Sequence, residues 1–310
     1  MNQVNIGFGA PVSGAWATPE NLASFARAAE DAGYHSLWSF QRLLVPTGSS
    51  MEPVYHSVLD PMAALAFAAA FTSRIRLGVA VINMPFVSPG YLAKQAASLD
   101  VLSGGRHDLG LGIGWMPEEF ALTGAEMARR GARSAEYVQA LRTLWAGGNS
   151  DFSGDFYQVP RGSQAPAPVQ PGGPPILLGG MAKPALERTG RIGDGWVTSS
   201  RTDLSRIGEL IGIVRESATA CGRDPGALRV VCRGVVRAGE EVIGPDGQRI
   251  RLSGTFDQII ADSAWLEEQG VTEIFYDLNW DPRIGAPDAD PVSAQARATE
   301  VMEALAPAAD

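Results

Sequence analysis

Two short apolar runs, at residues 77–84 and 109–115, dominate the hydrophobic pattern in the central part of the chain. Both runs are rich in Gly, Val, Ile and Leu and do not alternate polar with apolar positions, which is typical of strands buried on both faces of a parallel sheet. Residues 89–102, between the runs, carry apolar residues such as Leu92 and Ala96 at helical spacing and are followed by a glycine pair. The pattern therefore predicts a strand–helix–strand crossover.

The same alternation of strand and helix patterns continues over the rest of the chain. Strands are predicted at residues 4–10, 36–40, 77–84, 109–115, 176–180, 195–199, 228–236 and 273–279. Helices are predicted at residues 19–32, 60–72, 89–102, 117–145, 182–192, 204–221, 255–269 and 291–305. Eight strands that alternate with helices indicate an α/β fold with a parallel sheet, and their number favours a closed (β/α)8 barrel. A doubly wound open sheet is the alternative, although no GxGxxG motif follows the first strand.

Three segments interrupt this alternation. Residues 147–175, after the fourth strand, are rich in Pro and Gly and are predicted to be a surface excursion. Residues 241–252, after the seventh strand, are predicted to be a small hairpin insertion. Residues 41–59 are long enough to indicate a functional lid. Because strand and helix units resume after each interruption, residues 1–310 are predicted to form one domain.

Composition and charge narrow the possible partners. The net charge is -9 and no basic run exists, which argues against nucleic acid and anionic membranes as partners. No stretch is long enough to span a bilayer, and the N-terminus lacks a targeting pattern. Cys221 and Cys232 have no metal-like spacing, so a cytoplasmic protein without disulfides is expected. His35, His56 and His107 lie far apart in the sequence, and no metal site is expected.

Three tryptophans, Trp38, Trp115 and Trp196, lie at or near the ends of predicted strands. In a barrel, the active site lies where the strands run out into the following loops. The tryptophans either cap the barrel core or form an apolar, flat-walled cleft for a large ring. Gly110, Gly112 and Gly114 alternate along the fourth strand and leave one of its faces almost without side chains, so a bulky group can lie close to its end.

Gly179, Gly180 and Met181 follow the fifth predicted strand and open the helix from Ala182. Backbone N–H groups freed by glycine at a helix start form an anion site, and barrels often place a phosphate late in the strand order. A plain strand-to-helix turn, which also uses glycine, is the alternative. The motif favours a phosphate site.

No catalytic residue is identified from the sequence. Ser13 and Ser199 have no histidine in a recognisable motif, and Glu118 and Glu119 at a helix start are expected to favour the helix dipole. Asp277 alternates with apolar neighbours and is either a core-facing or a site carboxylate. Without a triad, a metal set or a phosphate-binding nucleotide loop, the sequence points to a reaction carried by a cofactor.

The motifs together resemble the luciferase-like monooxygenase superfamily of flavin- and deazaflavin-dependent (β/α)8 barrels. The version at residues 114–120, Gly-Trp-Met-Pro-Glu-Glu-Phe, is most similar to the branch that uses the deazaflavin coenzyme F420. The resemblance runs from end to end and is carried by residues 33–38, 76–78, 92–95, 99–106, 112–115, 118–120, 179–180 and 194–196, with Pro85 and Pro89.

The resemblance implies a cofactor that lies across the C-terminal mouth of the barrel. Its ring is expected to rest on a bulge in the third strand, at Val79, Ala80 and Val81, with a non-proline cis peptide between Ala80 and Val81. The phosphate is expected at Gly179, Gly180 and Met181, and Trp38, Gly114 and Trp115 are expected around the ring. The resemblance also implies a homodimer through the helices at residues 60–72 and 89–102.

One position departs from the family pattern. After the second strand the family often has an acidic residue followed by histidine, whereas this chain has Gln41 and Arg42. The general acid is therefore unassigned, and Arg42 is a candidate ligand for an anionic group of cofactor or substrate.

The expected function is hydride transfer between coenzyme F420 and a small organic substrate. The alternatives are an FMN-dependent monooxygenase with a reductase partner and a flavin- or deazaflavin-binding protein without turnover. A cofactor-free barrel lyase is disfavoured because no base or Schiff-base lysine is evident at a strand end.

Overall fold

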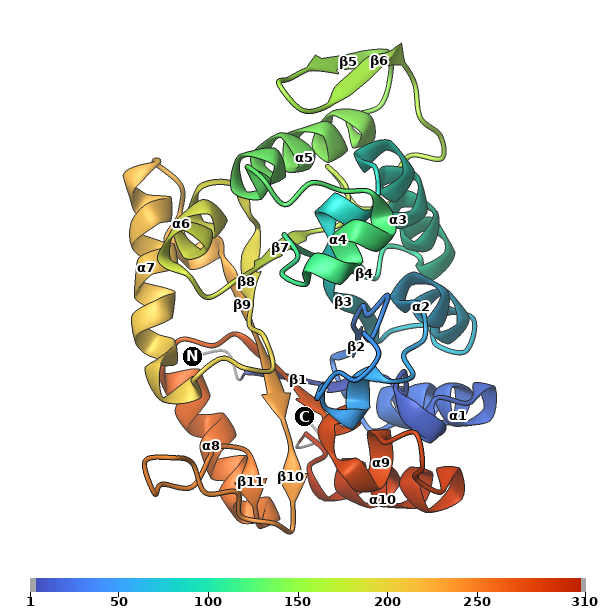
Figure 1. The fold of residues 1–310 in the computed structure, drawn as a ribbon, viewed down its shortest axis with the longest axis vertical. Helices are drawn as coiled ribbons and strands as arrows, with labels where there is room; N and C mark the ends of the chain where they lie inside the picture. Colours follow the sequence, from blue (N-terminus) through green and yellow to red (C-terminus); the bar gives the residue numbers. More distant parts are fainter. Residues whose placement is uncertain (1–3, 308–310) are drawn as a thin grey trace.

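Eight parallel strands close into a barrel because the first strand pairs with both the second and the last (Figure 1). The computed structural model describes residues 4–307, so the first and last three residues of the predicted domain lie outside the described residues. The strands follow one another around the barrel in chain order, which confirms the predicted (β/α)8 fold. They are β1 (Asn5–Gly9), β2 (Ser36–Ser39), β3 (Arg76–Asn83), β4 (His107–Gly112), β7 (Ile176–Gly179), β8 (Gly195–Val197), β9 (Arg229–Val235) and β12 (Glu273–Asp277).

Helices surround the barrel, and several begin where the sequence provides both a side-chain cap and a proline. The Thr18, Asp60 and Ser88 side chains accept backbone N–H groups of the first turns of α1, α2 and α3. No helix among residues 4–307 is both long enough and apolar enough to cross a membrane. The helices are α1 (Pro19–Asp31), α2 (Pro61–Ala69), α3 (Pro89–Ser103), α4 (Pro117–Thr123), α5 (Arg130–Trp145), α6 (Lys183–Ile192), α7 (Ile207–Ala220), α8 (Phe256–Glu268), α9 (Pro282–Gly285) and α10 (Pro291–Ala304).

The prediction of one helix over residues 117–145 is wrong, because the segment is divided between α4 and α5. Gly124 follows α4 in the left-handed region, with φ 68°, and Arg129 precedes α5 with φ 55°. A residue in the left-handed region interrupts the right-handed helical geometry, so one helix cannot continue through both positions. The break leaves α4 as a short helix beside the barrel mouth.

Two excursions carry small sheets of their own. Within residues 147–175, β5 (Ser150–Ser153) and β6 (Gln158–Gly162) form an antiparallel pair at the top of Figure 1. After β9, the two-residue strands β10 (Arg237–Ala238) and β11 (Ser253–Gly254) pair in parallel. The hairpin predicted between them is reduced to a single antiparallel bridge between Ile243 and Arg249.

The barrel interior is filled by large side chains that stack across it. The Trp38 ring lies parallel to the Phe275 ring at a centroid distance of 5.2 Å. A Cβ atom at Gly78 would collide with the Trp38 ring, so the neighbouring strand needs glycine at this position. The Trp38 Nε1–H donates to Glu273 Oε1 at 2.9 Å, toward the end of the barrel where β12 begins.

A buried ion network closes the N-terminal end of the barrel. Asp108 is fully buried and accepts hydrogen bonds from Arg76 Nη2 at 2.6 Å and Arg229 Nη1 at 2.7 Å. Arg229 Nη2 also donates to Glu273 Oε2 at 2.7 Å. Burial alone raises the pKa of the Asp108 carboxyl, but the two arginines outweigh it and hold that pKa below its usual value. The network therefore links β3, β4, β9 and β12 near the N-terminal ends of these strands.

Candidate functional site

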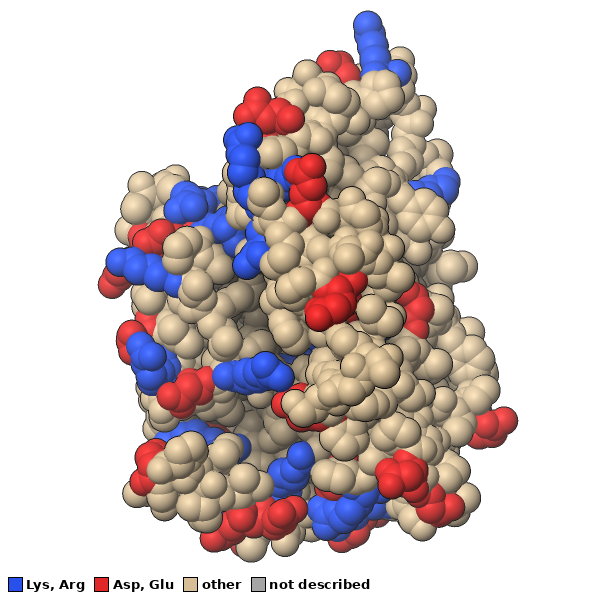
Figure 2. Space-filling view, in the orientation of Figure 1, with Lys and Arg blue, Asp and Glu red and all other residues tan. Residues whose placement is uncertain are grey.

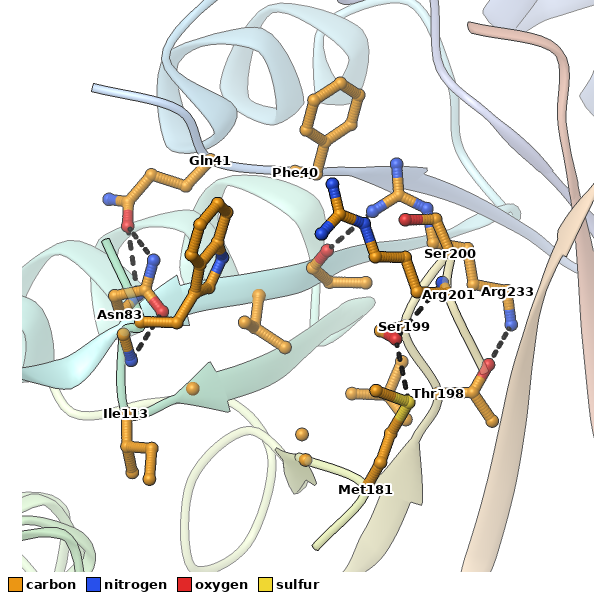
Figure 3. A pocket seen from close by; sticks show the side chains of 18 of the residues that line it. Phe40, Gln41, Asn83, Ile113, Met181, Thr198, Ser199, Ser200, Arg201 and Arg233 are labelled. Carbon is orange, nitrogen blue, oxygen red and sulfur yellow. Dashed lines mark hydrogen bonds between the residues drawn. The ribbon is translucent and has the colours of Figure 1, made fainter. Parts of the chain in front are cut away.

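A cavity of about 380 Å³ opens at the C-terminal mouth of the barrel (Figure 3). Its lining comes from the ends of β2, β3, β4, β7, β8 and β9 and from the loops that follow them. Most of the residues that the sequence predicted around a cofactor lie together in this lining: Gln41, Arg42, Ala80, Val81, Gly114, Trp115, Gly179, Gly180 and Met181.

Trp38 and Val79 do not line the cavity, and their predicted place in its wall is wrong. Trp38 is 1% exposed and belongs to the packed barrel interior, because its indole points toward Ser36 and Glu273 at the other end. Val79 is fully buried in the larger hydrophobic cluster, whereas its neighbour Ala80 belongs to the barrel interior. Strand alternation explains the difference, since successive residues point to opposite faces.

The floor of the cavity is formed by a bulge in β3. The Ala80–Val81 peptide bond is cis, as the family resemblance implied, and the pairing register with β4 shifts between Val79 and Ile82. A Cβ at Gly112 would lie 2.6 Å from Val81 Cγ2, so β4 needs glycine to pass this close to the bulge. Gly112 and Gly179 therefore leave this part of the floor without side chains.

An amide network joins the loops that follow three of the strands. The Gln41 Oε1 atom accepts from the backbone N–H of Asn83 at 3.0 Å and from its Nδ2 at 3.3 Å. The Asn83 Oδ1 atom in turn accepts from the backbone N–H of Gly114 at 3.0 Å. Figure 3 shows Gln41 and Asn83 facing each other on one side of the cavity, across from Ser199 and Met181. The sequence analysis missed Asn83, although its polar amide within the apolar run at residues 77–84 was a signal.

Arg42 is held by a buried carboxylate. Its Nη1 lies 3.1 Å from Glu119 Oε1, and the two side chains are 6% and 2% exposed. Glu119 also accepts the backbone N–H of Leu43 at 2.8 Å, so it anchors the start of the loop at residues 41–59. The Arg42 guanidinium lies over the rings of Tyr55 and Trp115, at 4.5 and 5.2 Å. Glu119 therefore does more than favour a helix dipole, and the charge of Arg42 is already compensated.

The start of α6 lies at the rim of the cavity without a side-chain cap. Its N-cap residue is Ala182, whose methyl group cannot accept a hydrogen bond. Gly180, in the cavity lining, has φ 128°, and a Cβ there would lie 2.7 Å from Ala185 Cβ. The Gly180 carbonyl accepts from Trp196 Nε1 at 2.9 Å, which buries Trp196 beneath this turn rather than in the cavity wall. Pro184 has no N–H and the Ala185 N–H already donates to the Ala182 carbonyl at 2.8 Å, so of the first three residues of α6 only Lys183 can offer a backbone N–H to an anion.

Arg233, on β9, is a buried cation beside the floor and was not identified from the sequence. It is 7% exposed, its Nε donates to Asp277 Oδ2 at 2.7 Å, and its Nη1 donates to the Ala80 carbonyl at 3.4 Å. Its guanidinium also lies 4.6 Å from the centre of the Phe40 ring. Asp277 is thus the carboxylate that holds Arg233 at the cavity. A charged residue within the apolar run at residues 228–236 was the available signal.

Comparison with known sequences shows the family to which the chain belongs. A model of the family described as luciferase-like monooxygenase matches residues 5–243. An uncharacterized protein of Mycobacterium tuberculosis is 31% identical over 290 residues, which cover 89% of this chain and 91% of that protein. An F420-dependent glucose-6-phosphate dehydrogenase of Amycolatopsis mediterranei is 30% identical over 210 residues (65% of this chain, 60% of that protein). An FMNH(2)-dependent dimethylsulfone monooxygenase of Pseudomonas putida is 29% identical over 200 residues (64% and 53%).

Solved structures share the whole fold. An F420-dependent secondary alcohol dehydrogenase in complex with an F420-acetone adduct matches with a TM-score of 0.78 and 17% identity, over 98% of this chain and 99% of that chain. The monooxygenase RslO1 from Streptomyces bottropensis matches with a TM-score of 0.77 and 22% identity, over 96% and 97%. At these identities the similarity establishes the barrel fold.

Proposed function

The chain belongs to the luciferase-like monooxygenase family, and on that premise we propose that it transfers a hydride between coenzyme F420 and an organic substrate. The observation that carries the proposal is the lining of the mouth cavity. Within the described residues, this lining has a glycine floor and aromatic walls but no carboxylate, imidazole, thiol or amine. Such a cavity can bind and orient a ring, while the bond-making chemistry comes from a cofactor.

The residues of the cavity fit a phosphorylated ring system. Val81, Gly112 and Gly179 would support the ring from below, and Trp115 would cover its edge. The uncapped start of α6, behind Gly180 and Met181, would hold the phosphate. When bound, a deazaflavin supplies the carbon that gains or loses the hydride. The aromatic residues around the mouth would exclude water from that carbon.

FMN is the second candidate cofactor, because family members use both groups. The dimethylsulfone monooxygenase of Pseudomonas putida supports an FMN-dependent monooxygenase that works with a reductase partner. The glucose-6-phosphate dehydrogenase of Amycolatopsis mediterranei and the motif around Trp115 support F420. Both cofactors carry a phosphate, so the turn at Gly180 accommodates either.

Titration of the purified protein with F420 and FMN, side by side, tests the choice of cofactor. We expect F420 to bind more tightly, because of the motif around Trp115. FMN binding tenfold more tightly, equal to about 1.4 kcal/mol, would overturn the F420 proposal. Reduction or oxidation of the bound cofactor by a panel of alcohols and aldehydes then separates an enzyme from a protein that only binds the cofactor.

We also propose a homodimer through α2 and α3. These neighbouring helices expose apolar side chains, among them Phe67 on α2 and Tyr91 and Leu102 on α3, the last two 62% and 70% exposed. We take these exposed apolar side chains as the contact surface, because apolar residues exposed together favour a protein–protein contact. Light scattering should give the mass of a dimer, and Leu102→Glu should give that of a monomer.

A further inference from the structure

A second cavity, of about 970 Å³, adjoins the mouth cavity. Ser200, Arg201 and Arg233 line both, so the two spaces meet at these residues. The outer wall of the second cavity comes from the loop after β8 and from the insertion between β10 and β11. Figure 2 shows a hollow in the lower left part of the view, with Lys and Arg side chains (blue) and Asp and Glu side chains (red) around it.

Arginines outnumber carboxylates in the lining of the second cavity, although the whole chain is acidic. Its lining has five arginines and only two carboxylates, Asp203 and Asp246. Four of the arginines already have an acidic partner: Arg201 pairs with Glu52, Arg233 with Asp277, and both Arg249 and Arg251 with Asp262.

Arg237 is the exception. No ion pair joins it to any described carboxylate, and its buried Nη1 has no hydrogen-bond partner among residues 4–307. Burial lowers the pKa of its guanidinium, and the carboxylates of Asp281 and Glu240 offset this only in part. A buried N–H donor without a partner is unfavourable, and a planar guanidinium matches a carboxylate or a phosphate with two parallel hydrogen bonds.

The remaining lining of the second cavity is partly apolar. Val235, Val242 and Ile250 contribute side chains to the same space as Arg237. A ligand that satisfies both parts of this lining carries an anionic group on an apolar body.

We propose that the second cavity binds the carboxylate or phosphate of an organic substrate, whose apolar body reaches the mouth cavity past Arg233. This inference rests on the proposed function, since it assigns the mouth cavity to the cofactor and the second cavity to the substrate. Arg237 is the residue that contacts the anionic group. The substrate class is therefore an amphipathic organic anion.

Calorimetric titration with hexanoate, hexyl phosphate and uncharged 1-hexanol tests the proposal, first on the free protein and then on protein loaded with F420 or FMN. We expect both anions to bind about tenfold or more tightly than hexanol, the size of one charge-assisted hydrogen bond. Arg237→Met should remove that difference, and Arg237→Lys should keep part of it. The control Arg161→Met removes the same charge at an exposed site on β6 and should leave anion binding unchanged.

Three results would overturn the proposal. The first is that neither anion binds the wild-type protein more tightly than hexanol, and the second is that Arg237→Met binds the anions as the wild type does. The third is that the anions displace the cofactor and Arg237→Met weakens cofactor binding, because the arginine then serves the anionic group of the cofactor. Anion binding to the free protein is measured without cofactor. Its outcome therefore does not depend on whether the protein transfers a hydride with F420, and the two proposals can fail separately.

Discussion

The two ends of the barrel use arginine in opposite ways. At the N-terminal end, Arg76 and Arg229 both meet Asp108, and the carboxylate is completely withdrawn from water. At the C-terminal mouth, Arg237 keeps a donor without a partner among residues 4–307, and α6 begins without a side-chain cap. In (β/α)8 barrels the N-terminal end serves stability and the C-terminal end serves binding. The unpartnered donor of Arg237 and the uncapped start of α6 therefore lie at the end of the barrel where a ligand is expected.

The largest loss of stability should come from a substitution in the buried ion network at the N-terminal end of the barrel. Asp108→Asn removes the charge shared by Arg76 and Arg229 and leaves both guanidinium groups without their central partner. We expect the free energy of unfolding to fall by about 3 kcal/mol, as for other buried ion pairs that lose one member. Urea titration measures the change. Glu126→Gln, which breaks an exposed pair with Arg133, is the control and should cost less than about 1 kcal/mol.

A loss below about 1 kcal/mol for Asp108→Asn would show that the network contributes little to stability. The N-terminal end would then not be the stabilising end of the barrel, and only the unpaired groups at the mouth would distinguish the two ends.

Glu119→Gln tests whether the mouth, like the N-terminal end, contains a buried ion pair that stabilises the fold. Glu119 binds both Arg42 and the backbone of Leu43, so its charge fixes the start of the loop at residues 41–59. We expect the free energy of unfolding to fall by about 2 kcal/mol, the value of hydrogen bonds to a charged group. Limited proteolysis should then cut within residues 41–59 faster than in the wild type. Glu118→Gln is the control, because Glu118 lies exposed on the same helix turn. Unchanged proteolysis would contradict the anchoring role.

Ala182→Asp should separate stability from binding at the mouth. An aspartate at the N-cap accepts a first-turn amide of α6 and is expected to stabilise the protein by about 1 kcal/mol. The same carboxylate would repel a phosphate at this turn, so cofactor affinity should fall about tenfold, equal to about 1.4 kcal/mol. Gly180 is unsuitable for this test, because a side chain there would collide with Ala185.

Thermal unfolding and a fluorescence titration measure the two effects of Ala182→Asp. Ala182→Ser is the matched control, since serine caps the helix without a charge and should weaken binding less. An unchanged cofactor affinity for Ala182→Asp would mean that the phosphate binds elsewhere.

A further prediction concerns Glu30, a half-buried carboxylate near the closed end. Glu30 accepts the backbone N–H groups of Ser73, Arg74 and Ile75, in the turn before β3. Burial raises the pKa of Glu30, but the hydrogen bonds together outweigh it and lower that pKa from 4.5 to about 2. A lowered folded-state pKa contributes stability above pH 4.5 that is lost as the pH falls toward 2.

Glu30→Gln should therefore flatten the pH dependence of unfolding between pH 4.5 and about 2. Urea titrations across that range measure the slope. Glu20→Gln, an exposed carboxylate at the start of α1, should leave the slope nearly unchanged. An identical slope in both variants would contradict the bracing role of Glu30.

The barrel could be predicted from the sequence because its signals are local. Buried parallel strands appear as continuous apolar runs, and helix starts carry residues such as Thr18 and Asp60 that cap them. The same local signals placed Gly179, Gly180 and Met181 at the mouth, since barrel loops after strands always meet at one end. The break between α4 and α5 was missed because helical periodicity in residues 117–145 outweighed the glycine at position 124.

The side-chain pairing in the site could not be predicted, because it joins residues far apart in the chain. Glu119 meets Arg42, and Asp277 meets Arg233, only after the barrel closes. Trp38 shows the converse error: its position on β2 suggested a cavity wall, but the direction of its ring depends on space left by Gly78 on the next strand. Spacing along the sequence does not record such contacts.

The pairing of β1 with β12 has a consequence for synthesis on the ribosome. β1 leaves the exit tunnel first but gains its second neighbour only when residues 273–277 emerge. Until then the nascent sheet has free edges at β1 and β9, and free edges are templates for pairing with other chains. Translation that stops before residue 273 therefore yields a sheet that cannot close, and such fragments are expected to aggregate or to be degraded.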